Sequence, residues 1–362
     1  MITVKIKLFD VNTGKQEEVA IQNVLKSHFW ASGSGIGNVS KFEKSFQNYI
    51  KSQGCVAVNN GTSALNLALS LVDLKNKEVI VPSLTFVSTV HAIVLNGGKP
   101  IFADIDPVTL CLDPHSVENA ISKKTAAILP VHFAGMPCDL FKLSKINKKN
   151  NLIMIEDAAH AAGATYNNSK IGSHGDLVCF SFHPVKNLAM PTGGLIALNS
   201  KQHKKQKNLL NSRRWCGISN RRGTSYDVNE IGWNYYMNEF SAAIGLIQLK
   251  KLDRMNNIRK KIARRYYKEF NVENKMSYDQ NCSYHIYWIQ VNNREKFMKN
   301  MAKNGIETGI HYNPIHQTKL YTKKFNLPIT EQVGKSIVSI PMHPNLNNSE
   351  IDSIISNVNK FA

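Results

Sequence analysis

A lysine follows directly after a stretch that is typical of a buried strand. Residues 177–182 are apolar or small, and His183 and Pro184 end the run, because proline offers no amide hydrogen to a sheet. Lys186 comes two residues later. In open α/β sheets, ligands bind beyond the carboxyl ends of the strands. A lysine there can act as a nucleophile or a base, although most single lysines are solvated surface groups, so the position alone does not decide the function.

Two acidic residues end an earlier run of the same kind. Residues 152–155 are apolar, as expected of a parallel strand that is covered on both faces, and Glu156 and Asp157 follow them. His160 lies three residues beyond Asp157. A second strand therefore ends in groups that can bind or ionise.

A third segment has the composition of a phosphate site. Residues 55–58 predict a short strand, and Asn59 and Asn60 lead into Gly61, Thr62 and Ser63 at the start of an apolar helix that we expect to reach Leu74. The free amides and positive end of such a helix attract phosphate. Ordinary helix capping would explain the same residues, so this pattern is weak by itself.

Together, the three segments match the requirements of pyridoxal 5'-phosphate. Its phosphate needs amides and hydroxyls, which residues 61–63 offer. Its pyridine nitrogen needs a carboxylate such as Asp157 to stay protonated, so that the ring can accept electrons. Its aldehyde needs an amine such as that of Lys186 for a Schiff base. We expect this cofactor and no metal.

The rest of the chain predicts an α/β fold that would place these segments at one sheet edge. Strand-like runs alternate with helical ones, which indicates a mostly parallel sheet with helices on both sides. The expected strands are residues 55–58, 78–82, 99–105, 126–131, 152–160, 177–182 and 195–198. Residues 213–230 are basic and loop-like, and a long amphipathic helix runs from about Asn238 to Tyr267.

The chain is long enough for two domains. We place the boundary inside the long helix, with a large domain at residues 1–245 and a smaller α/β domain at residues 246–362. In the smaller part we expect strands at 284–291 and 336–340, a helix at 295–304 and a closing helix from Ser349.

The composition limits which partners and which cellular compartment we expect. The chain has 45 basic and 26 acidic residues, a net charge of +19. Basic and aromatic residues are not interleaved as in proteins that bind single-stranded nucleic acid, so we expect an anionic small substrate and no nucleic acid.

No segment has the apolar length of a membrane span, the start lacks the apolar block of a signal peptide, and the six cysteines form no C-x-x-C pair. We expect a cytoplasmic protein.

The sequence resembles the DegT/StrS family of sugar aminotransferases, which have the type I (aspartate aminotransferase) fold. The resemblance spans nearly the whole chain. It rests on six motifs, which together are specific: residues 60–65 (NGTSAL), 81–86 (VPSLTF), 156–160 (EDAAH), 181–186 (SFHPVK), 232–235 (GWNY) and 311–314 (HYNP).

The resemblance implies a role for each matching residue. Lys186 would form the Schiff base and carry the proton between substrate carbon and cofactor, while Asp157 would pair with the ring nitrogen. Phe86 would stack on the ring and His160 would bind its oxygen. The residues that would hold the phosphate are Gly61, Thr62, Ser63 and Ser181, with Asn234 reaching the phosphate in the neighbouring subunit of a homodimer. The residues that would bind substrate are His183, Arg213, His311, Tyr312 and His316.

The implied reaction moves an amino group from an amino acid, with glutamate expected, to a keto group of a nucleotide-linked sugar. Two positions depart from the family pattern: Tyr236 stands where arginine is usual, and the loop 191–194 lacks the common acidic residue. The tetrapeptide 183–186 is similar to that of members that aminate a 4-keto sugar nucleotide on the way to nonulosonic acids.

Two alternatives remain open. A deoxygenating dehydratase on the same fold would keep the cofactor, but the relatives that do this carry histidine in place of the lysine, which Lys186 argues against. A non-catalytic protein that responds to a sugar nucleotide would be compatible with Tyr236 and the altered loop.

Overall fold

The computed structural model describes residues 5–321 and 325–362. Its centre is a seven-stranded sheet in the order β1-β9-β8-β5-β4-β2-β3. Every neighbouring pair is parallel except those that β9 makes, so β9 alone runs against the other strands of this sheet. The strands of this sheet are β1 Gly54–Val58, β2 Glu78–Pro82, β3 Lys99–Ala103, β4 Thr125–Ile128, β5 Ile153–Asp157, β8 Leu177–Ser181 and β9 Gly194–Leu198. The predicted mostly parallel sheet is confirmed.

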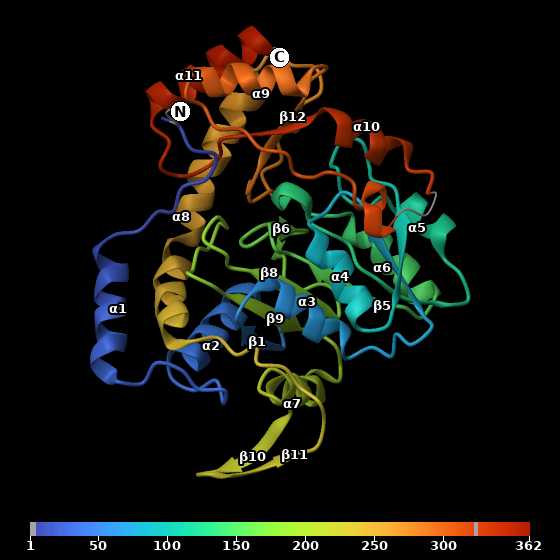
Figure 1. Cartoon of the computed structure of the whole chain (residues 1–362), viewed down its shortest axis with the longest axis vertical. Helices are drawn as coiled ribbons and strands as arrows, with labels where there is room; N and C mark the ends of the chain where they lie inside the picture. Colours follow the sequence, from blue (N-terminus) through green and yellow to red (C-terminus); the bar gives the residue numbers. More distant parts are fainter. Residues whose placement is uncertain (1–4, 322–324) are drawn as a thin grey trace.

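Helices cover both faces of this sheet, as Figure 1 shows. The α-helices of the described residues are α1 Lys15–Ser27, α2 Asn38–Ile50, α3 Gly61–Leu69, α4 Val87–Leu95, α5 Pro114–Ala120, α6 Leu140–Lys149, α7 His203–Arg213, α8 Glu239–Glu269, α9 Arg294–Lys303, α10 Pro328–Ser336 and α11 Asn348–Phe361. None of the helices within the described ranges combines the length and the apolar character that a bilayer crossing requires.

Strand β8 shows why the central strands read as unbroken apolar runs. Side chains alternate between the two faces of a strand. Accordingly, Val178 and Phe180 belong to one buried hydrophobic cluster and Leu177 and Cys179 to the other. Because both faces pack against helices, every position needs an apolar side chain until the strand ends at Ser181.

The carboxyl-terminal part is built around the far half of α8, which runs out of the large sheet region (Figure 1). It contains α9, α11 and a small antiparallel sheet of β12 Tyr287–Gln290 and β13 Ile337–Ile340. Ile6 also pairs with Ile306, so the described start of the chain lies against this part. The alternating pattern of residues 1–8 predicts an extended start, of which residues 1–4 lie outside the described residues. The two-domain division at residue 245 stays a prediction.

Two local predictions are wrong, and two helices were not expected. The predicted loop at 213–230 contains the hairpin of β10 Ile218–Arg222 and β11 Ser225–Val228, which projects from the molecule (Figure 1). Helices α7 and α10 were not predicted. Helix α3 ends at Leu69 and does not reach Leu74, and Arg213 donates to the carbonyl oxygen of Ser70, which another helical turn would have used.

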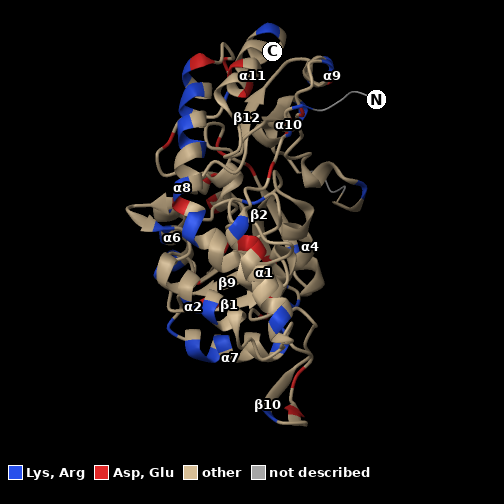
Figure 2. Ribbon diagram, turned by 90° about the vertical axis from the view of Figure 1, so that its left-hand side faces the viewer, with Lys and Arg blue, Asp and Glu red and all other residues tan. Residues whose placement is uncertain are grey.

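The positive charge of the chain is spread over several elements. Figure 2 marks the lysine and arginine positions in blue on the ribbon, and they lie on α7 and along α8, at different levels of the molecule. This distribution agrees with the scattered basic residues of the sequence and gives the molecule a broad attraction for anions.

Candidate active site

Asp157 ends β5 with its carboxylate buried beside the sheet edge. Thr89 Oγ1 donates to Oδ2 at 2.8 Å and the amide of Ala159 donates to Oδ1 at 3.0 Å. Burial raises the pKa of Asp157, while these two hydrogen bonds and the charge of Lys186 act in the opposite direction. A buried carboxylate that is held in a fixed orientation is suited to pairing with a cationic group.

Lys186 lies one strand away, in the turn that follows β8, which pairs in parallel with β5. Its Nζ is 3.3 Å from Nε2 of His285. Burial lowers the pKa of Lys186 to about 8, against the opposing charge of Asp157. An amine with this pKa is deprotonated in an appreciable fraction of molecules at neutral pH, which makes it a competent nucleophile.

His160 and Tyr312 meet although 152 positions separate them in the sequence. Nδ1 of His160 accepts the amide hydrogen of Ala134 at 3.2 Å, and Nε2 lies 3.2 Å from the Tyr312 hydroxyl. Burial lowers the pKa of His160 well below its usual value, and the charges of Lys186 and His311 lower it further. His160 is therefore neutral, with its proton on Nε2 facing Tyr312.

The predicted phosphate segment packs directly on the end of β8. A Cβ on Gly61 would lie 2.6 Å from Cβ of Ser181, so only glycine allows this approach. Asn60 caps α3 by accepting from the Ser63 amide at 2.8 Å, and the Ser63 hydroxyl donates to Asn59 at 2.7 Å. Thr62 is exposed at the same helix start. The positive helix end and the hydroxyls of Thr62 and Ser181 fit a phosphate group.

The loop that departs from the family pattern supports this segment. The Thr192 hydroxyl donates to the carbonyl oxygen of Asn59. A Cβ on Gly194 would lie 2.3 Å from the carbonyl oxygen of Asn60. The altered loop therefore retains a structural task, the support of the turn before α3.

We expect Gly61→Ala to damage the cofactor site selectively. The added methyl group must push α3 away from Ser181, which should cost about 1–3 kcal/mol of the free energy of unfolding and weaken pyridoxal phosphate binding. Thermal denaturation with and without the cofactor measures both effects. Gly97→Ala is a control for glycine replacement in open space, although its positive φ adds backbone strain, so it should affect stability only. Unchanged cofactor affinity in Gly61→Ala would contradict the assignment.

Phe86 and His183 lie exposed at the same edge. Phe86 is 54% exposed, and its ring centroid is 5.9 Å from that of Tyr312. Burial and the nearby Lys186 lower the pKa of His183. An accessible aromatic face at the sheet edge that carries Lys186 and Asp157 is what a planar cationic ring requires.

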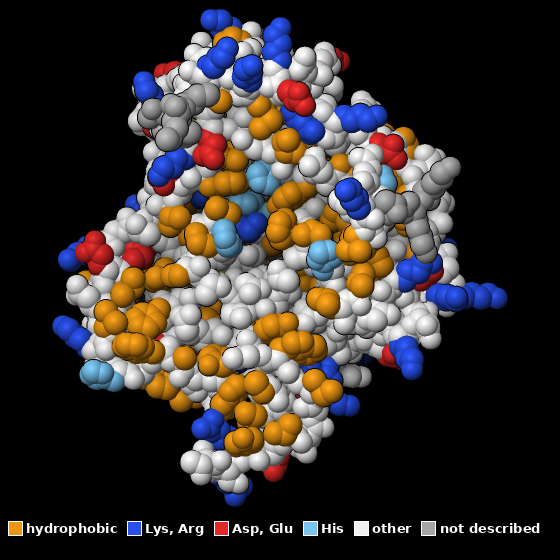
Figure 3. All heavy atoms as spheres, in the orientation of Figure 1, with side chains coloured by type: hydrophobic (Ala, Val, Ile, Leu, Met, Phe, Trp, Pro, Cys, Tyr) orange, Lys and Arg blue, Asp and Glu red, His pale blue; other side chains and the backbone are white. Residues whose placement is uncertain are grey.

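His311 joins the group from the carboxyl-terminal part. Its Nδ1 lies 2.9 Å from the Ser339 hydroxyl. Burial lowers the pKa of His311 to about 4, and the charge of Lys186 contributes. Figure 3 shows histidine and basic side chains at the floor of a hollow with hydrophobic side chains at its rim.

The structure gives other partners to two predicted substrate residues. Arg213 donates to Glu230 at 2.8 Å and to Ser70 at the far end of α3 from Gly61. His316 is buried, with Nδ1 at 2.7 Å from the Ser83 hydroxyl. Their substrate roles stay predictions.

Asn234 is exposed on a different segment, where it pairs with Trp215 in an isolated bridge. Tyr236 follows two residues later and lines a surface pocket of about 390 Å³ with Trp215 and Arg221. The exposed position of Asn234 is compatible with a contact to another subunit.

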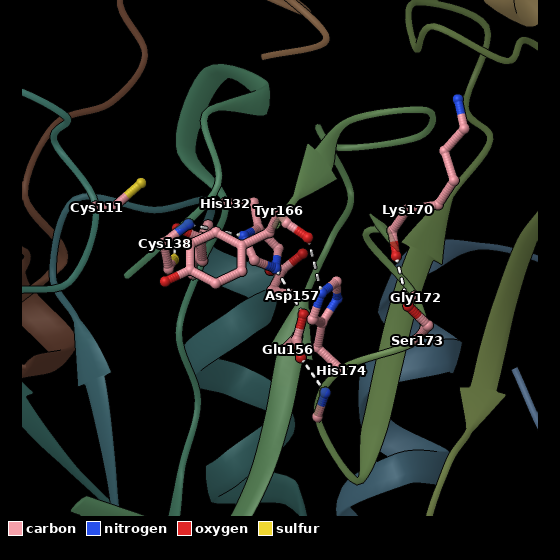
Figure 4. A network of polar contacts seen from close by, with 12 residues as sticks. Cys111, His132, Cys138, Glu156, Asp157, Tyr166, Lys170, Gly172, Ser173 and His174 are labelled. Atoms are coloured by element: carbon pink, nitrogen blue, oxygen red, sulfur yellow. Dashed lines mark hydrogen bonds and ion pairs between the residues drawn. The ribbon is translucent and has the colours of Figure 1, made fainter. Parts of the chain in front are cut away.

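Glu156 and Asp157 serve different purposes, because neighbours in a strand point to opposite faces. Glu156 is fully buried and accepts from Nε2 of His132 at 2.8 Å and from the amide of Gly175. Nδ1 of His132 accepts from the Cys138 amide at 3.1 Å. Figure 4 shows this network, which ties the end of β5 to two loops and so fixes the strand that carries Asp157.

Two residues of the candidate site were not predicted from the sequence. Thr89 orients Asp157 and itself receives a hydrogen bond from Thr85 at 2.9 Å. His285 contacts the Lys186 amine across 99 positions. The pair of threonines four residues apart after strand β2 offered a weak hint of the first; nothing local indicated the second.

Comparisons with known proteins agree with this geometry. Residues 11–359 match the model of the DegT/DnrJ/EryC1/StrS aminotransferase family. An uncharacterised protein of Methanocaldococcus jannaschii is 34% identical, and the match covers 96% of this chain and 95% of that protein. Helicobacter pylori PseC, an aminotransferase involved in the biosynthesis of pseudoaminic acid, is 26% identical with a TM-score of 0.92, and the match covers 98% of each chain.

A protein of Streptococcus pneumoniae assigned as a sugar aminotransferase is also similar. Its pyridoxal phosphate form is 25% identical, with a TM-score of 0.91 and coverage of 98% of this chain and 97% of that one. Its pyridoxamine phosphate form has a TM-score of 0.92. The residues described above fit the same cofactor.

Proposed function

Because the chain belongs to the DegT/DnrJ/EryC1/StrS aminotransferase family, and its relatives are pyridoxal-phosphate-dependent sugar aminotransferases, we propose the following reaction for it. The enzyme moves the amino group of L-glutamate to a keto group of a nucleotide-linked sugar. The observation that carries the proposal is the placement of the Lys186 amine, whose pKa burial lowers to about 8, and of the oriented carboxylate of Asp157 at the ends of two paired parallel strands.

Each residue of the candidate site has a separate role in the proposed reaction. When bound, the cofactor supplies an electron-accepting ring for the charge that develops on the substrate carbon. Asp157 would keep a proton on the ring nitrogen, and Thr89 holds that carboxylate in line. Lys186 would anchor the cofactor covalently and, when its amine is free, would move the proton at the substrate carbon. Thr62 and Ser181 hold the phosphate with the α3 amides, while His160 and Tyr312 bind polar groups at the ring's edge.

The surroundings support an anionic sugar substrate and an intracellular site of action. A net charge of +19 attracts a sugar nucleotide, and His183, His311 and Tyr312 offer hydrogen bonds beside Lys186. The cysteines of the described residues are all free thiols, which is compatible with the cytoplasm. We propose that the product is an amino sugar for a surface polysaccharide or another glycoconjugate.

Incubation with glutamate tests the reaction. The purified enzyme, loaded with pyridoxal phosphate, is given glutamate and a panel of 3-keto and 4-keto sugar nucleotides, and 2-oxoglutarate is followed together with the mass of the sugar product. We expect equimolar 2-oxoglutarate and amino sugar with at least one substrate. A deoxygenated sugar without consumption of glutamate would favour the dehydratase, and no product with any substrate would contradict the proposal.

We also propose a homodimer in which Asn234 serves the partner's site. This predicts that two inactive variants, Lys186→Ala and Asn234→Ala, restore activity when they are unfolded together and refolded as a mixture. Each mixed dimer would hold one intact site, so about a quarter of the wild-type activity should return with random pairing. If Asn234 served its own chain, no mixed dimer would contain an intact site, and the mixture would stay inactive.

A further inference from the structure

His285 lies against the amine of Lys186 and is held there from several sides. Its Nε2 is 3.3 Å from Nζ of Lys186, and its own amide donates to the carbonyl oxygen of Ala134 at 2.9 Å. The ring stacks on Phe9 with centroids 5.3 Å apart and planes 16° apart, and the ring of His160 lies 4.4 Å away. The imidazole is 98% buried and has little freedom to turn.

The charges around His285 keep it neutral. Burial lowers its pKa well below the usual value, and the groups that lower it further are all basic: Lys186, His160, Arg259 and His311. Its Nδ1 has no hydrogen-bond partner among the described residues, and neither have Nε and Nη1 of the buried Arg259. None of the groups that shift the pKa of His285 is a carboxylate.

The protonation states then fix the direction of the contact. With a pKa of about 8, the Lys186 amine carries its proton in most molecules at pH 7, whereas His285 has a bare ring nitrogen to offer. Nζ therefore donates and Nε2 accepts, and the remaining ring proton is on Nδ1.

We propose that His285 is the hydrogen-bond acceptor that holds the ε-amine of Lys186 whenever this amine is not covalently bound to the cofactor. The inference rests on the proposed function, because an aminotransferase must release this lysine when the donor's nitrogen replaces it and take it back in each turnover. His285 acts through Lys186, as a positioning residue: it keeps the released amine at the place from which it moves the substrate proton.

The test uses the cofactor-free enzyme and does not depend on turnover. Trace acetic anhydride labels amines in proportion to their unprotonated fraction, and mass spectrometry of the peptide with Lys186 gives its labelling at each pH. We expect a midpoint near pH 8 in the wild type. In His285→Leu the charged amine loses its acceptor, so the midpoint should fall by about one pH unit.

Two further variants separate this contact from general damage. His285→Gln places an amide oxygen close to the position of Nε2, so its midpoint should return toward the wild-type value. His285→Asn is polar but too short to reach Nζ, so it should show the same fall as leucine and gives a second reading if His285→Leu does not fold. A fall in neither His285→Leu nor His285→Asn would overturn the proposal.

A matched control is His343→Leu. His343 is also buried and also feels the charge of Arg259, but its Nε2 bonds to the carbonyl oxygen of Lys7 at 3.1 Å and not to Lys186. Its replacement should leave the Lys186 midpoint unchanged; an equal fall would show that any lost histidine has this effect and would overturn the proposal. If the expected shifts occur but glutamate never yields 2-oxoglutarate, the contact stands and the proposed function fails.

Discussion

Lys186→Ala is expected to abolish covalent attachment of pyridoxal phosphate and to lower the transamination rate by about a thousandfold or more. The change removes both the amine that bonds to the cofactor and the group that moves the proton at the substrate carbon. The phosphate segment and Asp157 are untouched, so we expect the cofactor still to bind without a covalent bond. Borohydride reduction followed by mass spectrometry of the Lys186 peptide, with the rate of 2-oxoglutarate formation, measures both effects.

Lys170→Ala serves as the matched control for this variant. Lys170 is also partly buried, with its Nζ 2.8 Å from Asp253, but it lies outside the group around Lys186. Its loss should leave cofactor attachment and turnover near wild-type values. Covalent attachment that persists at another lysine in Lys186→Ala, together with undiminished turnover, would show that the wrong residue has been assigned.

Asp157→Asn should reduce kcat about a hundredfold or more while the protein stays folded. Asparagine has nearly the same shape, but it has no charge to hold a proton on the ring nitrogen, so the ring accepts electrons less well. The removed carboxylate also raises the pKa of Lys186 in the wild type, so the lysine pKa should fall below about 8 in this variant. Rates measured from pH 6 to pH 9, with labelling of Lys186 over the same range, record both effects.

The stability of this variant separates a catalytic role from a structural one. Burial raises the pKa of Asp157, so the ionised carboxylate lowers the stability of the folded state. This cost grows as the pH rises from the pKa that Asp157 has in the unfolded chain to its higher pKa in the folded protein. Asparagine removes this cost, so we expect no large drop in the thermal midpoint at pH 7. If the loss of activity only followed a loss of folded protein, Asp157 would be structural.

The strand ends could be predicted because their pattern is local. Strands β5 and β8 are covered on both faces, so the change from apolar to polar side chains marks where each strand leaves the core. That placed Asp157 and Lys186 at one edge from residue types alone. The antiparallel direction of β9 was not visible, because a buried strand looks the same in either direction.

The elements that were missed have few buried side chains. In α7 only Leu210 is buried, so the helix has no apolar stripe to recognise. The strands of the β10–β11 hairpin are largely exposed, and no regular alternation marks them. The contacts that tune the site come from distant positions: Thr89 is 68 residues from Asp157, and His285 is 99 residues from Lys186. Residue type also does not reveal a partner, as the pairing of Arg213 with Glu230 shows.

A crystal structure of the enzyme grown with pyridoxal phosphate tests the central claim most directly. The account predicts continuous density from Nζ of Lys186 into the cofactor and a carboxylate oxygen of Asp157 about 2.7–2.9 Å from the ring nitrogen. It also predicts the phosphate between the start of α3 and Ser181. A cofactor bound elsewhere, or a ring that touches only one of the two side chains, would contradict it.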